Sequence, residues 1–230
     1  MPVSQTPSGA GPAISSRPPE GIWRVARSPA VLNFAEIGAE DATLPHAGNR
    51  FDVPGGGVLY CATDLAGCCA ETLARFRPTP AMHRAMAEED ASFMMVGGVP
   101  ADWRHRRLKA RITTEGALPF LNIEAPQTRE WLQRELADAL ASFDVSDLDV
   151  SVVRGGNRLI TRTIARWAYD QTDATGNPLY SGIRYLSRLG TYECWAVFDG
   201  TAITEVNRST IELSDPALQE VQRSFSLRVF

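Results

Sequence analysis

The sequence has no long hydrophobic run, and this absence limits where the protein can work. None of its 230 residues lie in a stretch that reaches the roughly 18 consecutive apolar residues of a membrane-spanning helix. The N-terminus also lacks the basic and then apolar regions of a secretory signal peptide. We therefore expect a soluble, cytoplasmic protein that does not enter a membrane.

The chain also has little excess charge of either sign. Its formal net charge is −4, and no long run of lysine and arginine is present. The one compact basic stretch, 104–111, alternates basic with apolar residues, which favours a strand with one solvated face. A protein that binds a polyanion usually carries a clustered basic surface. We therefore expect no direct contact with nucleic acid.

Cysteine and histidine are too few and too scattered to predict a metal site. No two cysteines have the CxxC spacing of a zinc site, and the two adjacent cysteines cannot form an ordinary disulfide with each other. We expect buried free thiols in a reducing cytosol. The residues concerned are Cys61, Cys68, Cys69 and Cys194, with His46, His83 and His105.

The composition predicts one domain that follows a disordered tail. Residues 1–20 are rich in proline, serine, glycine and alanine, and such a segment buries too little apolar surface to offset its ordering entropy. Residues 21–230 have an ordinary globular composition, with 44% hydrophobic residues. The stretch 77–156 separates two regions rich in motifs, and we interpret it as an insertion.

Strand and helix patterns alternate in residues 21–230 without a regular βαβ rhythm. We therefore predict a single α+β domain. The expected strands are 22–26, 58–62, 92–99, 106–112, 182–186 and 193–198. The expected helices are 64–76, 127–143 and 157–171, with a loop at 41–48 and a turn at 54–57.

Glu71 occupies an unusual position in the first predicted helix. Asp64 is a suitable N-cap, and apolar residues recur after it at three- and four-residue spacing. Glu71 lies beside this apolar stripe, in the middle of the helix. Its carboxylate must therefore be exposed at the edge, paired or functional. A surface ion pair with Arg75 at i+4 is the ordinary structural alternative.

Three separated segments carry the residues that we consider for chemistry. The first contains Trp23-Arg24 and Gly48-Asn49-Arg50-Phe51. The second runs from Gly57 to Ala62 and is followed by Ala70-Glu71. The third is Gly182-Ile183-Arg184-Tyr185-Leu186-Ser187-Arg188, followed by 194–199. In order and spacing this set resembles the RES domain, a family named for an arginine, a glutamate and a serine. The likeness covers residues 21–77 and 158–199.

The resemblance implies a fold, an activity and a partner. RES proteins are typically toxins of bacterial toxin–antitoxin pairs, with a fold like that of diphtheria-type ADP-ribosyltransferases. They consume NAD by phosphorolysis or hydrolysis, and some transfer ADP-ribose to a protein. Their usual partner is a small antitoxin with a helix-turn-helix domain. NAD is then a substrate, inorganic phosphate a candidate co-substrate, and no cofactor is required. The oligomeric state stays open, a homo-oligomer included.

The residue chemistry is compatible with that activity. Breaking the nicotinamide–ribose bond develops oxocarbenium character on the sugar, which a carboxylate such as Glu71 can stabilise. Arginine matches phosphate oxygens, so Arg24 and Arg50 are candidates for the pyrophosphate. Tyr60 could pack against the nicotinamide end. Ser187 could bond the substrate or fix Glu71, but no base near it in sequence would make it a nucleophile.

Each of these residues also has an ordinary structural interpretation. Arg24 and Arg50 could be surface arginines, Tyr60 a core residue of its strand, and Ser187 a residue at a strand end. Two rival functions also stay open. The same site could transfer ADP-ribose to a protein, or the fold could be a catalytically silent binding module.

Overall fold

A mixed eight-stranded sheet forms the centre of the computed structural model, which describes residues 11–88 and 96–230. Within it only β6 and β7 pair in parallel, while the other neighbours are antiparallel. The strands, in their order across the sheet, are β1 (Ile14–Ser15), β6 (Phe120–Asn122), β7 (Gly182–Leu186), β8 (Glu193–Phe198), β3 (Val58–Ala62), β2 (Ile22–Arg27), β5 (Arg107–Thr113) and β9 (Thr204–Thr210). Two further strands, β4 (Gly98–Val99) and β10 (Arg228–Val229), form a separate parallel pair.

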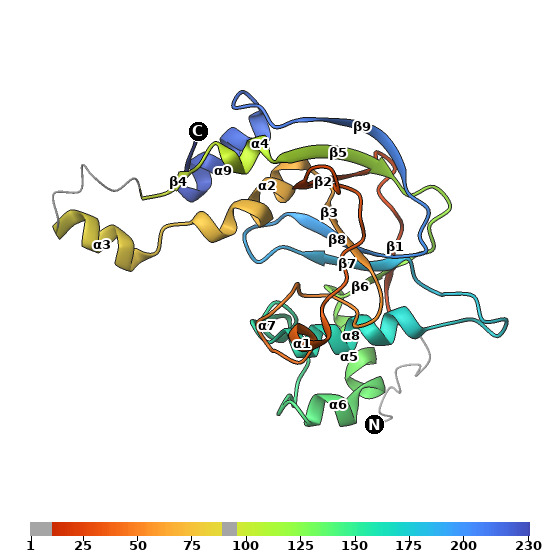
Figure 1. Ribbon diagram of the computed structural model, residues 1–230. Helices are drawn as coiled ribbons and strands as arrows, with labels where there is room; N and C mark the ends of the chain where they lie inside the picture. The colour runs from red at the N-terminus through yellow and green to blue at the C-terminus, as the bar shows by residue number, and fades with distance from the viewer. Residues whose placement is uncertain (1–10, 89–95) are drawn as a thin grey trace, which may run out of the picture.

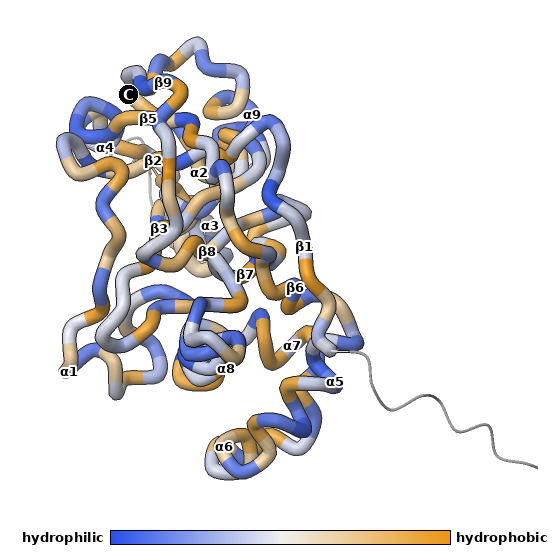
Figure 2. Tube along the Cα trace, turned by 90° about the vertical axis from the view of Figure 1, so that its right-hand side faces the viewer, coloured by the Kyte–Doolittle hydropathy of each residue, from blue (hydrophilic) through white to orange (hydrophobic). Residues whose placement is uncertain are grey.

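Helices gather at the two ends of the molecule, with the sheet between them (Figure 1). At one end lie α2 (Leu65–Leu73), α4 (Asp102–His105) and α9 (Pro216–Phe225). At the other lie α5 (Pro126–Glu135), α6 (Ala137–Ala141), α7 (Val150–Val153) and α8 (Arg158–Asp170). Figure 2 shows the same separation from the side. The remaining helical segments are α1 (Ala39–Ala42), the 3₁₀ turn η1 (Ala74–Phe76) and α3 (Pro80–Glu88). The class is α+β, as the sequence predicts.

The core is divided by the sheet into two clusters. Along β3, alternate residues face opposite sides, as the pleat of a strand requires. Val58 and Ala62 join the larger cluster with the buried faces of α2, α8 and α9, whereas Leu59 and Cys61 join a smaller cluster with Trp195. Both faces of β3 are therefore buried, which explains its continuous apolar sequence.

The two helices that border the site begin where the sequence places them. The Asp64 side chain accepts a 2.7 Å hydrogen bond from the Gly67 amide, and this starts α2. Asn157 does the same for α8, accepting from the Leu159 amide at 3.1 Å. Each cap satisfies an amide that would otherwise lack a partner in the first turn.

The helix predicted over 127–143 is wrong as a single element. It divides at Leu136, whose φ of −112° and ψ of 22° leave the helical region. Leu132 and Leu140 are eight residues apart and would differ by about 80° around a straight helix. The break brings both into the core, whereas the other predicted core positions of this segment are not fully buried.

Other element predictions differ from the structure in detail. The loop expected at 41–48 begins with the last residues of α1. Of the strand expected over 92–99, residues 92–95 lie outside the described residues, and β4 supplies only Gly98–Val99. Neither β9 nor α9 was expected from the sequence, although both lie in the described part of the chain.

The N-terminal segment is partly ordered, which corrects the expectation of disorder over 1–20. Residues 1–10 lie outside the described residues, but Ile14–Ser15 form β1 and pair with β6. The Ala13 amide also donates to the Thr128 hydroxyl at 2.9 Å. The exposed backbone edge of β6 explains the order, because an unpaired strand edge is a template for another strand.

The stretch 77–156, interpreted from the sequence as an insertion, is part of the central sheet. It contributes β5 and β6, which lie inside the central sheet between other strands. In the part of the chain that the structure describes, no helix is long and apolar enough to cross a membrane.

Candidate active site

A pocket of about 300 Å³ opens where β2 and β3 meet α2 and the start of α8. Four arginines and one carboxylate contribute to its lining. Arg24 comes from β2, Arg50 from the loop before β3, Glu71 from α2, Arg158 from the first turn of α8, and Arg188 from the segment after β7. The excess of guanidinium groups suits a ligand with several negative charges.

Glu71 is held by Ser187, as one of the two sequence interpretations of that serine predicts. The buried Ser187 hydroxyl donates to Glu71 Oε1 at 2.6 Å and accepts from the Leu189 amide at 3.0 Å. Glu71 itself is exposed toward the pocket. Among the described residues no ion pair joins it to Arg75, whose guanidinium lies 4.7 Å from the Phe76 ring instead. The serine therefore fixes the orientation of the carboxylate.

Arg24 is anchored to the backbone by two hydrogen bonds. Its Nε donates to the Val31 carbonyl at 2.6 Å, and its Nη1 donates to the Tyr60 carbonyl at 2.8 Å. These two bonds hold the guanidinium plane and leave the Nη2 amino group for a ligand. The side chain is thus oriented before anything binds, which lowers the ordering cost of binding.

Arg50 is placed by the turn that precedes it. Gly48 has φ of +61°, a left-handed conformation that favours glycine, and a Cβ atom there would lie 2.5 Å from Ile37 Cδ1 and 2.6 Å from Asp52 Oδ2. The Thr161 hydroxyl of α8 then donates to the Arg50 carbonyl. The guanidinium donates from Nη1 to the Leu186 carbonyl at 3.3 Å.

The surroundings of Arg50 favour the binding of an anion. Its guanidinium carbon lies 5.2 Å from the Tyr185 ring centre and 5.8 Å from that of Phe51. Burial lowers the pKa of Arg50, and the positive charge of Arg188 lowers it further, while Glu71 opposes the change. The negative charge of a bound anion would offset the desolvation of Arg50 and its repulsion by Arg188.

The Tyr60 hydroxyl forms its hydrogen bonds within the protein and not toward the open pocket. It donates to Asp52 Oδ1 at 2.8 Å and accepts from the Phe51 amide at 3.0 Å. Burial, together with the Asp52 charge, raises the pKa of Tyr60 well above its usual range. Tyr60 still lines the pocket, where its ring is available for packing.

The sequence analysis assigned no role to two of the lining arginines, although Arg188 lies in the third motif segment. Arg158 follows the cap of α8 and donates to the Gly48 carbonyl, so it also holds the turn that carries Arg50. Arg188 is exposed and makes no hydrogen bond or ion pair with another described residue. The position of Arg188 directly after Ser187 was the sequence signal that could have indicated a role in the site. For Arg158 the only signal was its place after a cap.

The thiols near the pocket are not suited to nucleophilic chemistry. All four cysteines are free and buried. Burial raises the pKa of Cys61 to about 12, and it raises the pKa of Cys68 well above the usual range. A neutral thiol is a weak nucleophile. In the described part of the chain, no group of three or more histidine, cysteine or acidic residues could hold a metal ion.

Comparison with known proteins places this geometry in a family. No curated protein matches the sequence. A structural match is a chain from the crystal structure of the M. tuberculosis MbcT–MbcA toxin–antitoxin complex, at 12% identity and a TM-score of 0.49, covering 90% of this chain and 89% of that one. The RES domain model matches residues 22–218. Because this match spans most of the chain, including all five residues singled out from the motifs, the protein belongs to the RES-domain family.

Proposed function

We propose that this protein breaks the nicotinamide–ribose bond of NAD, with inorganic phosphate or water as the acceptor. The observation that carries the proposal is the Glu71 carboxylate, oriented by Ser187, in a pocket otherwise rich in arginine. A glycosidic cleavage site needs a fixed carboxylate, and a dinucleotide needs cations for its pyrophosphate. Membership of the RES family, which typically consumes NAD, supports the same assignment.

The residues have separate roles in this proposal. Arg24 and Arg50 bind the pyrophosphate oxygens, and the Tyr60 ring packs against the nicotinamide end. The bond between C1′ of the ribose and the nicotinamide nitrogen breaks, and its electron pair leaves with neutral nicotinamide. The positive charge that develops on the sugar is stabilised by Glu71. Ser187 keeps the carboxylate directed at that position.

The acceptor then completes the reaction at C1′. Water forms a C–O bond and releases one proton, which gives ADP-ribose. Inorganic phosphate attacks through an oxygen and gives ADP-ribose 1″-phosphate. Arg188 has no partner among the described residues and is suited to hold a phosphate there.

The family assignment also supports a role as a bacterial toxin. Uncontrolled consumption of NAD would stop growth, so the protein would need an inhibitor. We propose a small antitoxin with a helix-turn-helix domain as the partner. Growth arrest on expression of the wild-type chain, and none on expression of Glu71→Gln, is the expected result.

The activity is tested by incubation of the purified protein with NAD labelled in the adenylate half. Free ADP-ribose or its phosphorylated form is the expected product. Label on a protein band would indicate ADP-ribosyl transfer to a side chain instead. Unchanged NAD after long incubation, with unimpaired growth on expression, would identify a silent binding module.

Glu71→Ala and Glu71→Gln test the carboxylate. We expect kcat to fall by about 100- to 1,000-fold in both, because charge stabilisation in the transition state is lost. Glu71 is exposed, so the fold should persist, with an unchanged circular dichroism spectrum and unfolding midpoint. Turnover at the wild-type rate would remove Glu71 from the mechanism.

Arg50→Ala tests phosphate recognition. We expect KM for NAD to rise by about tenfold or more, since a charge-assisted hydrogen bond to a phosphate oxygen is lost. Arg27→Ala is the matched control, because Arg27 lies on β2 but is exposed and does not line the pocket. An equal KM in both variants would show that Arg50 does not bind substrate.

A further inference from the structure

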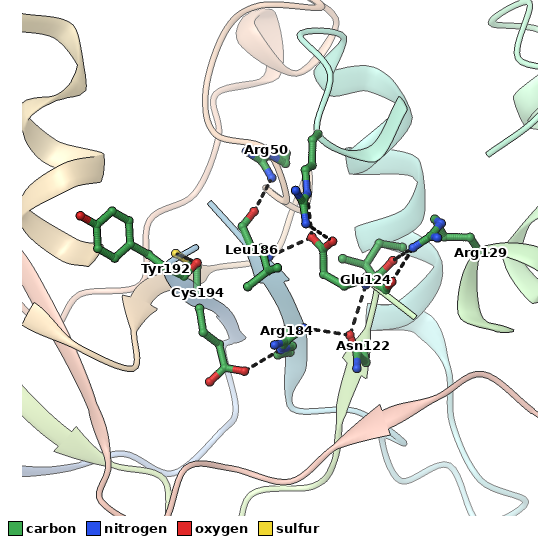
Figure 3. Close-up of polar contacts among 11 residues, drawn as sticks. Arg50, Asn122, Glu124, Arg129, Arg184, Leu186, Tyr192 and Cys194 are labelled. Atoms are coloured by element: carbon green, nitrogen blue, oxygen red, sulfur yellow. Dashed lines mark hydrogen bonds and ion pairs between the residues drawn. The ribbon is translucent and has the colours of Figure 1, made fainter. Parts of the chain in front are cut away.

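At the end of β7, the amide and the carbonyl of Leu186 lie beyond the pairing with β6, and two side chains bond them instead. The parallel pairing of β6 with β7 ends at Asn122 and Arg184. Two residues further along, the Leu186 amide donates to Glu124 Oε1 at 2.9 Å, and the Leu186 carbonyl accepts from Arg50 Nη1 at 3.3 Å. Figure 3 shows Arg50, Leu186 and Glu124 in this arrangement.

Glu124 is itself fixed by an arginine from another element. Arg154 donates from Nη2 to Glu124 Oε2 at 2.5 Å and from Nε to Oε1 at 3.3 Å, and the Glu124 side chain is only 9% exposed. A carboxylate with two arginine bonds and one amide bond has little freedom to move. Arg129 holds the backbone of the same residue, donating to the Glu124 carbonyl at 2.6 Å.

Glu124 joins the segment after β6 to two segments that supply residues of the pocket. Glu124 follows β6, Leu186 ends β7, and Arg154 ends the turn after α7. Directly after Leu186 comes Ser187, which binds Glu71, and directly after Arg154 comes Gly155, which lines the pocket. Glu124 does not line the pocket, so its effect on a ligand must pass through these neighbours.

We propose that Glu124, paired with Arg154, is a positioning residue for substrate recognition: it holds the backbone of Leu186 through the amide, and thereby places the Leu186 carbonyl that binds the guanidinium of Arg50. The inference rests on the proposed function for its kinetic consequence. The geometric part concerns the free protein and stands without it. The two parts therefore call for two separate measurements.

The geometric measurement is hydrogen exchange at the Leu186 amide in the unliganded protein. We expect strong protection in the wild type, because the amide donates to a nearly buried carboxylate. Glu124→Ala should increase the exchange rate by about 100-fold, since the acceptor is lost. Glu124→Gln keeps a side-chain oxygen and should recover most of the protection. Equal protection in the wild type and in Glu124→Ala would overturn the proposal.

The kinetic measurement compares KM with kcat for NAD. For Glu124→Ala we expect KM to rise by about tenfold, with kcat falling by less than about threefold, because the group displaced is Arg50 and not Glu71. Glu124→Gln should restore KM to within about threefold of the wild type, since the bond to Leu186 is kept. A fall in kcat at unchanged KM would overturn the assignment to Arg50.

Glu193→Gln is the matched control. Glu193 forms a partly buried pair with Arg184 of β7, at 2.7 Å. It lies opposite Leu186 in the β7–β8 pairing, but its side chain does not bond Leu186 and does not line the pocket. Its KM should equal that of the wild type, and an equal rise in both variants would indicate a general loss of structure. If Glu124→Ala fails to fold, Glu124→Met keeps the side-chain volume and removes both acceptor oxygens. If the wild type does not consume NAD, the proposed function fails, and the exchange rates still decide whether Glu124 holds Leu186.

Discussion

At the scale of single residues, the site depends on side chains that hold other side chains. Ser187 holds Glu71, Asp52 holds Tyr60, and two backbone carbonyls hold Arg24. In each case one polar group of the functional side chain is bonded within the protein, and the rest of that side chain lines the pocket. Catalytic groups that are oriented in advance lose less freedom when a ligand binds.

Tyr60→Phe tests this division of roles. We expect the free energy of unfolding to fall by about 1 to 3 kcal/mol, because the buried Asp52 carboxylate and the Phe51 amide each lose a partner. KM for NAD should stay within about twofold, since the ring that we propose to pack against the nicotinamide end is kept. Urea denaturation and steady-state kinetics measure the two effects.

Tyr180→Phe is the control for that substitution. The Tyr180 hydroxyl makes no hydrogen bond with another described residue, so its loss should change stability by less than about 0.5 kcal/mol. Equal stability of the two variants would show that the Tyr60 hydroxyl does not support the turn at Phe51.

The motif order and spacing in the sequence singled out residues that the fold brings together, while their roles stay predictions. Glu71, Arg24, Arg50 and Tyr60 line the same pocket, and Ser187 contacts it through Glu71. Glu124 and Arg154 gave no such signal. They depend on where β6 stops beside β7, and the pairing of distant strands cannot be read from local periodicity.

At the scale of elements, β7 and β8 approach so closely that one glycine is required. Gly182 has φ of +152°, and a Cβ atom there would lie 2.1 Å from the Ala196 carbonyl oxygen of β8. No flexible side chain can move to make room, because the obstacle is backbone. The strand that leads to Ser187 is thus fixed at its first residue.

We expect Gly182→Ala to reduce the free energy of unfolding by about 3 kcal/mol, through strain in φ and displacement of β7. Gly176→Ala is the control, since Gly176 also has a positive φ, +86°, but nothing lies within 4 Å of a Cβ atom there. That change should cost about 1 kcal/mol. Thermal unfolding of both variants measures the difference, and equal midpoints would contradict the close approach.

Strands whose own sequence forms an apolar run between turns were predicted with correct bounds, whereas strands without such a run were not predicted. β3, β7 and β8 have the predicted bounds, because apolar runs bordered by turns define them. The exposed strand β9 has no apolar alternation, since all seven of its residues are exposed, and its partner β5 alone determines its existence. A strand of this kind follows from tertiary pairing and not from its own sequence.

At the scale of the whole molecule, the sheet gathers strands from every part of the chain. β1, near the N-terminus, closes the edge next to β6, and β9 forms the opposite edge beside β5. The stretch between the two motif regions supplies β5 and β6. The family match over residues 22–218 agrees with a single structural unit, which the composition alone could not distinguish from a domain with an insertion.

Removal of residues 1–16 tests the contribution of β1. We expect the unfolding free energy to fall by about 1 to 3 kcal/mol, because the pairing with β6 and the bonds of Ala13 to Thr128 and Asn122 are lost. NAD turnover should persist, since no residue of β1 lines the pocket. Loss of turnover in a folded truncation would show that this segment acts on the site.

The bond from Ser187 to Glu71 has a stereochemical consequence. It engages one carboxylate oxygen, so the other oxygen is left for the ribose of the proposed substrate. Rotation of the carboxylate by a quarter of a turn would break that bond, so the bond fixes the plane of the carboxylate. A bound ribose would therefore meet the acid along a fixed edge, with one of its two faces open to attack. We expect the released sugar to form as a single anomer.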